Sequence, residues 1–430
     1  MGRRESKREG ETMIHRWIIL AAVLFAGQTL LHGAWSEVHS ATGADVMDHD
    51  NFGAVLATFG DTVVVGSPYD GDPHGEFGSA YVFQWNGASL VEQVKLSALV
   101  QGDGDRFGTA LSHYPDHIVI GAPGDNYAWT VSYGAVYDFR RAGGAWVQDA
   151  RLVPSDSYNN DRFGRAVAVS GDYMAVGGGG AAYVFHRQAG SWTEAARITA
   201  SDAGGREYFG ISIGLDGDYM VVGAHLEPEG GGSTKAGAAY VFHRENGSWV
   251  EQAKLTAANR MAGDRFGTSV AIQGDRIVVG APYDDDVDKN AGTVHVFRRN
   301  ESAWGLEAIL TPFDDGSSDH DRFGGSIAFD GERMLVGAFG NSDGIGSSGA
   351  GYLFRLQADT WEQVAKLKPS TPFDNDSAGS AVALGADWYV LGAPGGSPHY
   401  RPGSVYVFVP EPATLALVTL GGLALIRRRG

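Results

Sequence analysis

A Phe-Gly dipeptide recurs along the chain at intervals of 46–57 residues. Six copies are intact and a seventh has alanine in place of phenylalanine: Phe52-Gly53, Phe107-Gly108, Phe163-Gly164, Phe209-Gly210, Phe266-Gly267, Phe323-Gly324 and Ala378-Gly379. The residues between the copies alternate between apolar and polar and are interrupted by glycine-containing turns, which is typical of short strands rather than helices. The repeat therefore predicts an all-β fold built as a radial array of similar sheets.

The fifth unit shows the expected strands most clearly. A Gly274-Asp275 turn leads into the β-branched residues 276–279, which end at Gly280-Ala281-Pro282. A polar loop and a third strand, residues 292–297, follow. A fourth strand begins at tryptophan and ends near Lys-Leu, as in residues 249–255 of the preceding unit. Each unit thus has four short strands, which is the content of one propeller blade.

These residues resemble the FG-GAP repeat family, which includes the repeats of the integrin α-chain head and of many bacterial surface proteins. The resemblance covers residues 35–409 and implies a seven-bladed β-propeller of four-stranded blades. Integrin-type copies carry a calcium-binding Asp-x-Asp-x-Asp-Gly hairpin before the Gly-Ala-Pro strand. In this chain a tight turn such as Gly274-Asp275 stands there instead, so the resemblance does not carry calcium binding over to these turns.

The spacing of tryptophan and phenylalanine indicates how the ring closes. The tryptophan lies 17 residues before the phenylalanine in several units, as in Trp249 and Phe266, and Trp35 lies 17 residues before Phe52. The seventh unit ends at Phe408 with no tryptophan strand after it. We therefore expect Trp35–Ala41 to supply the fourth strand of the last blade, which would cover an otherwise open sheet edge.

The C-terminal residues 410–430 combine three features in a fixed order. The triplet Pro410, Glu411 and Pro412 precedes an apolar run over residues 413–426, and Arg427, Arg428 and Arg429 follow. This order resembles a PEP-CTERM sorting tail, which implies processing by an exosortase after transient anchoring in the inner membrane. The apolar run is shorter than the roughly 20 residues of a full membrane span, and the arginines favour the cytoplasmic side. We expect a short transmembrane helix here; the alternative is an anchor that is never cut.

Residues 1–34 have the layout of a secretory signal peptide. Arg16 precedes an apolar core, and small residues up to Ala34 follow it. We expect a signal helix with cleavage after Ala34, and Met13 is the alternative start of the chain. A retained N-terminal anchor is the other interpretation. The chain has no cysteine, so an exported product would depend on its fold and on ions rather than on disulfides.

The net charge of the chain limits the kinds of molecule that it can bind. The formal net charge is −18 at pH 7, so the surface repels nucleic acid and other polyanions, and nucleic acid is not expected as a partner. The same charge favours cations or basic partners, although solubility outside the cell explains it equally well.

One acidic loop has oxygen-bearing side chains at alternating positions: Asp284, Asp286, Asp288 and Asn290. Calcium prefers clustered oxygen ligands from one loop, so these four residues are the candidate calcium ligands. The loop lacks the glycine and the glutamate of an EF-hand, and a solvated acidic loop is the alternative. A second acidic position lies two residues before each phenylalanine, as in Asp264. Its presence in every unit favours a turn-fixing role over a cation site.

The function we expect is that of a non-enzymatic protein of the cell surface or extracellular matrix. No recurring nucleophile, base and acid appear together, and no residues remain for a separate catalytic domain. The loops after the Gly-Ala-Pro strands are the expected binding surface for an extracellular polysaccharide or a surface protein. Their aromatic residues are the candidate contacts: Tyr69, Tyr127, Trp129 and Tyr283. The alternative is a hydrolase or lyase that acts on a polysaccharide at the propeller face.

Overall fold

A computed structural model describes residues 35–71, 75–127, 131–156, 161–202, 208–227, 235–313, 319–342, 346–395 and 402–411. The expected signal helix and Met13, Trp129, Pro412, the apolar tail and the three terminal arginines lie outside these residues. The described fold lies almost wholly within one compact unit, Glu37–Val409. Within the described part of the chain, no helix has the length and apolarity that a membrane crossing needs.

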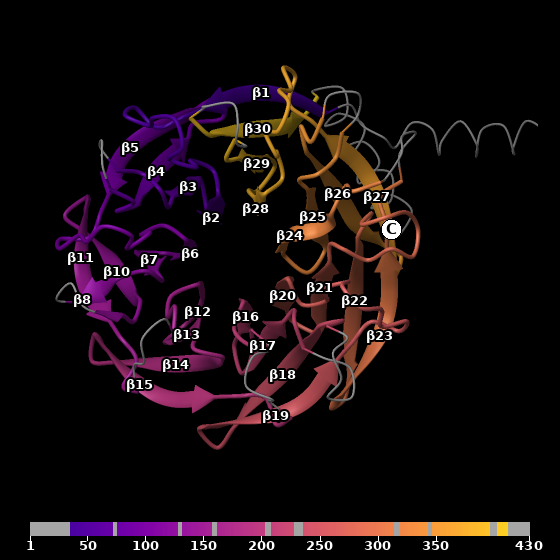
Figure 1. Cartoon of the computed structure of the whole chain (residues 1–430), viewed down its shortest axis with the longest axis horizontal. Helices are drawn as coiled ribbons and strands as arrows, with labels where there is room; N and C mark the ends of the chain where they lie inside the picture. The colour runs from indigo at the N-terminus through magenta and orange to yellow at the C-terminus, as the bar shows by residue number, and fades with distance from the viewer. Residues whose placement is uncertain are drawn as a thin grey trace, which may run out of the picture. The chain divides into compact units, whose positions relative to one another are not determined.

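Seven four-stranded antiparallel sheets make up the ring in Figure 1, so the expected all-β seven-bladed propeller is confirmed. The first three blades contain β2 (Val55–Phe59), β3 (Thr62–Ser67), β4 (Ser79–Trp85) and β5 (Leu90–Leu96); β6 (Ala110–Tyr114), β7 (His117–Ala122), β10 (Ala135–Ala142) and β11 (Ala145–Leu152); and β12 (Ala166–Ser170), β13 (Tyr173–Gly178), β14 (Ala181–Gln188) and β15 (Ser191–Ile198). A small ribbon of β8 (Asn126–Tyr127) and β9 (Val131–Ser132) lies in a loop of the second blade.

The next three blades follow the same order. They contain β16 (Ser212–Asp216), β17 (Tyr219–Ala224), β18 (Ala238–Glu245) and β19 (Ser248–Leu255); β20 (Ser269–Gln273), β21 (Arg276–Ala281), β22 (Thr293–Asn300) and β23 (Ala303–Leu310); and β24 (Phe323–Phe329), β25 (Arg333–Ala338), β26 (Ala350–Gln357) and β27 (Thr360–Leu367).

The seventh blade joins the two ends of the ring. Its strands lie in the order β1 (Trp35–Ala41), β30 (Ser404–Pro410), β29 (Tyr389–Ala393) and β28 (Ala381–Leu384). The side chain of Ala41 packs against the cluster that contains Val405 and Val407. The first strand of the described chain is therefore the outer strand of the last blade, the place that the 17-residue spacing predicts.

Burial explains why each strand has its sequence pattern. The two middle strands of a blade are packed on both faces, and β21 is buried along its whole length. Such strands tolerate a continuous run of valine, isoleucine and alanine. The outer strand has one face in solvent, and β15 accordingly alternates between exposed and more buried residues.

Each phenylalanine of the Phe-Gly pairs packs onto the third strand of its own blade. Phe323 is buried and meets Tyr352 and Phe354 edge to face, with ring centroids 5.5 Å and 5.9 Å away. The same pair of contacts recurs in the first six blades; in the fifth, His295 takes the place of the tyrosine. Because edge-to-face aromatic contacts add to the burial of these rings, the phenylalanine anchors the inner part of the blade.

Glycines make the close approach between neighbouring blades possible. A Cβ atom on Gly280, at the end of β21, would lie 2.1 Å from the carbonyl oxygen of Gly324 in the next blade. A Cβ atom on Gly392, in the last blade, would meet the carbonyl oxygen of Gly53, which precedes the first strand of the first blade. The same close approach therefore occurs where the ring closes. Gly324 also has a φ of 89°, a conformation that side chains disfavour. Both glycines of the repeat therefore serve the contact between blades.

Candidate functional site

Two sets of loops meet on one face of the propeller. The backbone N–H of Tyr69, after the second strand, donates to the carbonyl of Asp50, before the Phe-Gly pair, and Tyr283 donates to Asp264 in the same way. We call this side the Phe-Gly face: it carries the Phe-Gly pairs, the loops before them and the loops after each second strand. All the aromatic and acidic loop residues singled out from the sequence belong to these loops.

The acidic residue two positions before the phenylalanine fixes a turn. The carboxylates of Asp50, Asp105, Asp264 and Asp376 each accept a hydrogen bond from the backbone N–H three residues earlier, at 2.5–3.1 Å. Burial raises the pKa of Asp105 to about 6 and that of Asp264 to about 6, partly offset by these hydrogen bonds. The expected turn-fixing role is therefore confirmed at these four positions.

A second buried acidic residue recurs in the loops that follow the second strands of the blades, as Asp70 and Asp125 show. In the first blade the hydroxyl of Tyr81 donates to Asp70 at 2.6 Å, and Lys95 pairs with the same carboxylate at 2.8 Å. Burial, followed by the hydrogen bond to Asp70, raises the pKa of Tyr81 far above its ordinary value. In the second blade Tyr137, Asp125 and Arg151 repeat the arrangement.

Asp284 is the counterpart of this acid in the fifth blade. Its side chain is buried and accepts hydrogen bonds from the backbone N–H of Asp286 at 2.9 Å and from the hydroxyl of Thr293 at 2.8 Å. The Asp286 carboxylate accepts instead from the side-chain amide of Asn259. The backbone N–H of Asn290 donates to Asp285 at 2.6 Å, and the backbone carbonyl of Asp288 accepts from Ala291 at 3.0 Å.

The contacts of Asp284 and Asp286 do not support the candidate calcium site, for which a solvated acidic loop is the alternative. Asp284 points into the blade and Asp286 towards a neighbouring loop, so their carboxylates are engaged with different partners. Among the residues that the structure describes, no group of three or more histidine, aspartate or glutamate side chains could hold a metal ion. We therefore assign Asp284 to the blade core and derive no chemistry from a bound cation.

His295 occupies the position of the buried tyrosine in the fifth blade. Its Nε2 lies 3.1 Å from the Thr293 hydroxyl, which itself donates to Asp284, so this nitrogen carries the ring proton and donates. Its buried Nδ1 has no hydrogen-bond partner within the described residues. A second proton on the ring would have no acceptor, and burial accordingly lowers the pKa of His295 to about 4.

Because the pKa of His295 is lowered in the fold, we expect the wild-type protein to lose stability in mild acid. The variant His295→Tyr should lose less stability over the same pH range. Because the pKa falls from 6.5 in the unfolded chain to about 4 in the fold, the unfolded chain takes up the proton first and stability falls between these pH values. The loss from this group between pH 7 and pH 4.5 should be about 2–3 kcal/mol. Tyrosine could donate to Asp284 as Tyr81 does to Asp70. Chemical denaturation of both proteins at the two pH values measures the difference.

Histidines with a similar shift, His113 and His225, and the aspartates with raised pKa values are the same in both proteins, so their effects cancel in the comparison. Equal pH dependence in wild type and variant would show that the ring of His295 is accessible to protons in the fold.

Two of the four candidate aromatic contacts, Tyr69 and Tyr283, lie beneath arginines. Tyr69 and Tyr283 are half-buried, and the guanidinium groups of Arg106 and Arg265 lie 5.1 Å and 4.2 Å from their respective ring centroids. Tyr127 lies in β8, but its side chain and the whole of Trp129 are outside the described residues. At the two described rings a ligand would therefore meet the covering arginine side chain rather than a free aromatic face.

Arginines also line a cavity that the sequence patterns did not indicate. It has a volume of about 380 Å³, lies on the Phe-Gly face and is bounded by the side chains of Arg106, Arg162 and Arg165 together with Pro68, Tyr69 and Thr109. Glycines 104 and 124 and Pro123 complete the wall. Arg106 forms an ion pair with Glu76 at 2.9 Å. The only clue in the sequence was the residue after each Phe-Gly pair, which is charged in the third unit alone.

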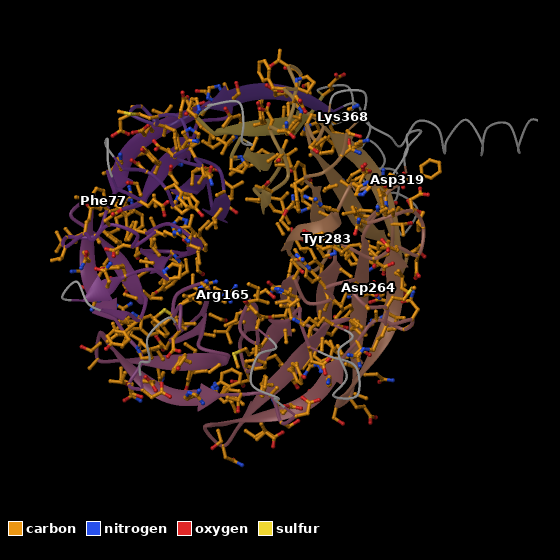
Figure 2. The ribbon with its side chains drawn as sticks, viewed as in Figure 1. Phe77, Arg165, Asp264, Tyr283, Asp319 and Lys368 are labelled. Carbon is orange, nitrogen blue, oxygen red and sulfur yellow. The ribbon has the colours of Figure 1, made fainter. Side chains whose placement is uncertain are left out.

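The cavity adjoins the central channel. At this end of the channel the first residues of all seven inner strands are mainly small or apolar, and Arg165 is the one charged residue among the described residues that line it there. Figure 2 shows Arg165 beside the central opening. Thr109 and Arg165 belong to both linings, so the arginine cavity is at the mouth of the channel.

The sorting motif begins where the last described strand ends. Pro410 is the final residue of β30 and Glu411 follows it without regular structure. Pro412, Arg427, Arg428 and Arg429 lie outside the described residues.

Comparison with protein families adds two findings. A family described as FG-GAP repeat matches residues 35–83, 90–139, 146–185, 192–242, 249–297, 304–354 and 361–408. A family described as PEP-CTERM protein-sorting motif matches residues 408–429. No curated protein matches the chain.

Proposed function

Because the seven matched segments cover well over half of its length, the chain belongs to the FG-GAP repeat family, and we propose that it is a non-enzymatic binding protein of the cell surface or extracellular matrix. The propeller and the PEP-CTERM sorting motif together imply an exported surface protein that is anchored in the membrane before sorting and processed by an exosortase. Release to the surface or matrix, and the binding of a polysaccharide or surface protein there, are the proposed further steps.

The observation that carries this proposal is the order of the two matched families along the chain. The match to the sorting-motif family begins at residue 408, where the last FG-GAP match ends, and the Pro-Glu-Pro triplet itself begins at Pro410. Cleavage near Pro410 would therefore remove the tail and leave every matched repeat intact. A short apolar segment behind a cleavage motif follows the logic of signals whose tail is absent from the mature protein.

We expect the mature protein to lack residues 413–430. The tail has 14 apolar residues between the Pro-Glu-Pro triplet and the arginines, too few for a stable permanent anchor. Intact-mass measurement of the protein from a host that contains an exosortase tests this. A matched host without the exosortase should retain the full tail. Full-length protein in the membranes of both hosts would instead favour a plain C-terminal anchor.

The binding role is supported by the geometry of the Phe-Gly face. Its loops surround the channel mouth, and loops carried on a rigid scaffold are common binding surfaces. Within the part of the chain that the structure describes, the lining of the arginine cavity includes no aspartate or glutamate, whereas glycoside hydrolysis normally uses a pair of carboxyl groups. A screen of the protein against polysaccharides and surface-protein extracts, with turnover measured in parallel, tests binding against hydrolase or lyase activity.

A further inference from the structure

Two arginines at the channel mouth have no carboxylate partner among the residues that the structure describes, although the protein is strongly acidic. Most arginines that the structure describes form ion pairs, for example Arg151 with Asp125. Arg162 and Arg165 form no ion pair within the described residues, although the chain has 51 acidic and 33 basic residues. Such unpaired cations in a cavity are unusual, because a partly desolvated charge is costly without a counter-charge.

The two charges also repel each other. Burial, and then the positive charge of Arg162, lowers the pKa of Arg165. The guanidinium of Arg165 lies over the ring of Tyr208 at 5.2 Å, and that ring stacks on His225. Tyr208 and His225 thus support the side chain from the neighbouring blade without neutralising it. A bound anion would supply the missing negative charge.

The third unit departs from the other units at this position. The residue after the Phe-Gly pair is alanine, threonine, isoleucine, threonine, glycine or serine in the other six units, and arginine only here. The propeller fold therefore does not require a cation at this place. Arg162, before the same pair, is not a departure: arginine with a positive φ also occupies this position in the second, fifth and sixth units, so Arg165 is what distinguishes the third unit.

We propose that Arg106, Arg162 and Arg165 bind an anionic sugar residue, one carrying a carboxylate or a sulfate, of a surface polysaccharide at the channel mouth. This proposal rests on the proposed binding function and specifies its ligand. Guanidinium groups bind such oxyanions through paired hydrogen bonds. The cavity of about 380 Å³ is within the size range of small-molecule sites. Pro68, Pro123 and the edge of Tyr69 offer apolar walls for a sugar ring.

The overall charge of the protein restricts the ligand further. A net charge of −18 repels a densely charged polymer such as nucleic acid at long range. Only the arginines of the cavity therefore attract an anionic ligand, and they do so at short range. This favours a polysaccharide whose charges are widely spaced, or one with a charged end. An acidic oligosaccharide of a few residues meets this requirement, because only one or two of its charges have to enter the cavity.

Calorimetry on the full-length chain in mild detergent tests the proposal with trigalacturonate as the carboxylate probe. A sulfated galactose disaccharide is the sulfate probe, and neutral galactotriose and inorganic sulfate are the comparison ligands. Arg165→Thr and Arg162→Asn introduce residues that other units carry at these positions, so both variants should keep the wild-type melting temperature. Arg265→Asn makes the same change at the corresponding position of the fifth unit, outside the cavity.

We expect the carboxylate or the sulfate probe to bind the wild type, and Arg165→Thr and Arg162→Asn to weaken that binding at least tenfold. Arg265→Asn should change it less than twofold. Equal losses in all three variants, or no binding of either acidic probe at millimolar concentration, would overturn the proposal. If inorganic sulfate binds as tightly as the acidic sugars, the site recognises a simple anion and the sugar assignment is wrong.

Failure of this inference is distinguishable from failure of the proposed function. Binding of galactotriose that is as tight as that of trigalacturonate, and unchanged in Arg165→Thr, would leave a polysaccharide-binding protein whose site is elsewhere. Absence of every glycan and protein partner in the wider screen would instead contradict the binding function itself.

Discussion

Replacing Phe323 by alanine should lower the free energy of unfolding by about 3–5 kcal/mol, the range for removal of a buried phenylalanine ring. The Phe323 side chain is fully buried, and it meets Tyr352 and Phe354 edge to face. The loss combines hydrophobic transfer with a cavity between the inner strand and the third strand, which the surrounding β-sheet cannot close easily. Denaturant unfolding followed by tryptophan fluorescence measures it. Phe266→Ala, in the fifth blade, should behave alike because its ring is equally buried.

Phe313→Ala provides the matched control. It removes the same ring from a loop where the side chain is 79% exposed, so the expected change is within about 0.5 kcal/mol. A loss below about 1 kcal/mol for Phe323→Ala would mean that the Phe-Gly phenylalanine is dispensable for packing. A large loss for both variants would point to a general sensitivity of the chain rather than to the repeat.

The fold could be predicted because its determinants are local and repeated. The Phe-Gly pair marks the entry to each inner strand, and the β-branched run before Gly-Ala-Pro marks a strand buried on both faces. Gly280 and Gly324 meet across a blade boundary, yet each is visible in the sequence as an invariant position of the unit. Seven copies of such a signal determine the architecture even where one copy has alanine, as at Ala378.

The role of Asp284 was harder to predict because it depends on which way a side chain points. In sequence, Asp284 is one of several acids in a polar loop and resembles a cation ligand. In the structure it is the buried partner of Thr293 and the equivalent of Asp70 and Asp125. A comparison between units could have shown this, since an acid or amide lies three residues after the end of the second strand in blades one, two, four, five and six.

The arginine cavity could not be predicted from any single unit. Arg106 belongs to the second unit, whereas Arg162 and Arg165 belong to the third, and only the contact between blades brings them to one cavity. The repeat pattern draws attention to positions that stay the same. A site of this kind depends on positions that differ, and Arg165 is informative because six other units have no charge there.

Deleting residues 35–41 should lower the melting temperature by roughly 6 °C, which corresponds to a loss on the order of 5 kcal/mol in a chain of this size. The deletion removes β1, the outer strand of the seventh blade. It exposes the edge of β30 and uncovers the cluster that Ala41 shares with Val405 and Val407. Several hydrogen bonds of about 1 kcal/mol each are lost together with this burial. Differential scanning calorimetry measures the shift, and light scattering should show more aggregation, because a free sheet edge pairs with other chains.

The family matches explain why closure matters for this ring. Each matched segment begins in an outer strand, at a tryptophan in six of the seven segments and at Leu90 in the other, and ends in a third strand; the first begins at residue 35. Every sequence repeat therefore straddles two blades, and the first repeat links β1 of the seventh blade to β2 of the first. Only in the seventh blade does the chain not run directly from the third strand, β30, into the outer strand. There the pairing of β1 with β30 takes the place of that direct connection.

A second variant separates the loss of a strand from the loss of its connection. The same seven residues are removed from the front and inserted after Val409 through a two-residue turn like Glu301-Ser302, which joins β22 to β23. This chain regains an outer strand in blade seven but no longer links that blade to the first. If the strand itself closes the sheet edge, aggregation should return to the wild-type level. If the covalent crossover also matters, the melting temperature should recover only in part. A deletion variant that melts like the intact protein would show instead that β1 contributes nothing to the closure of the ring.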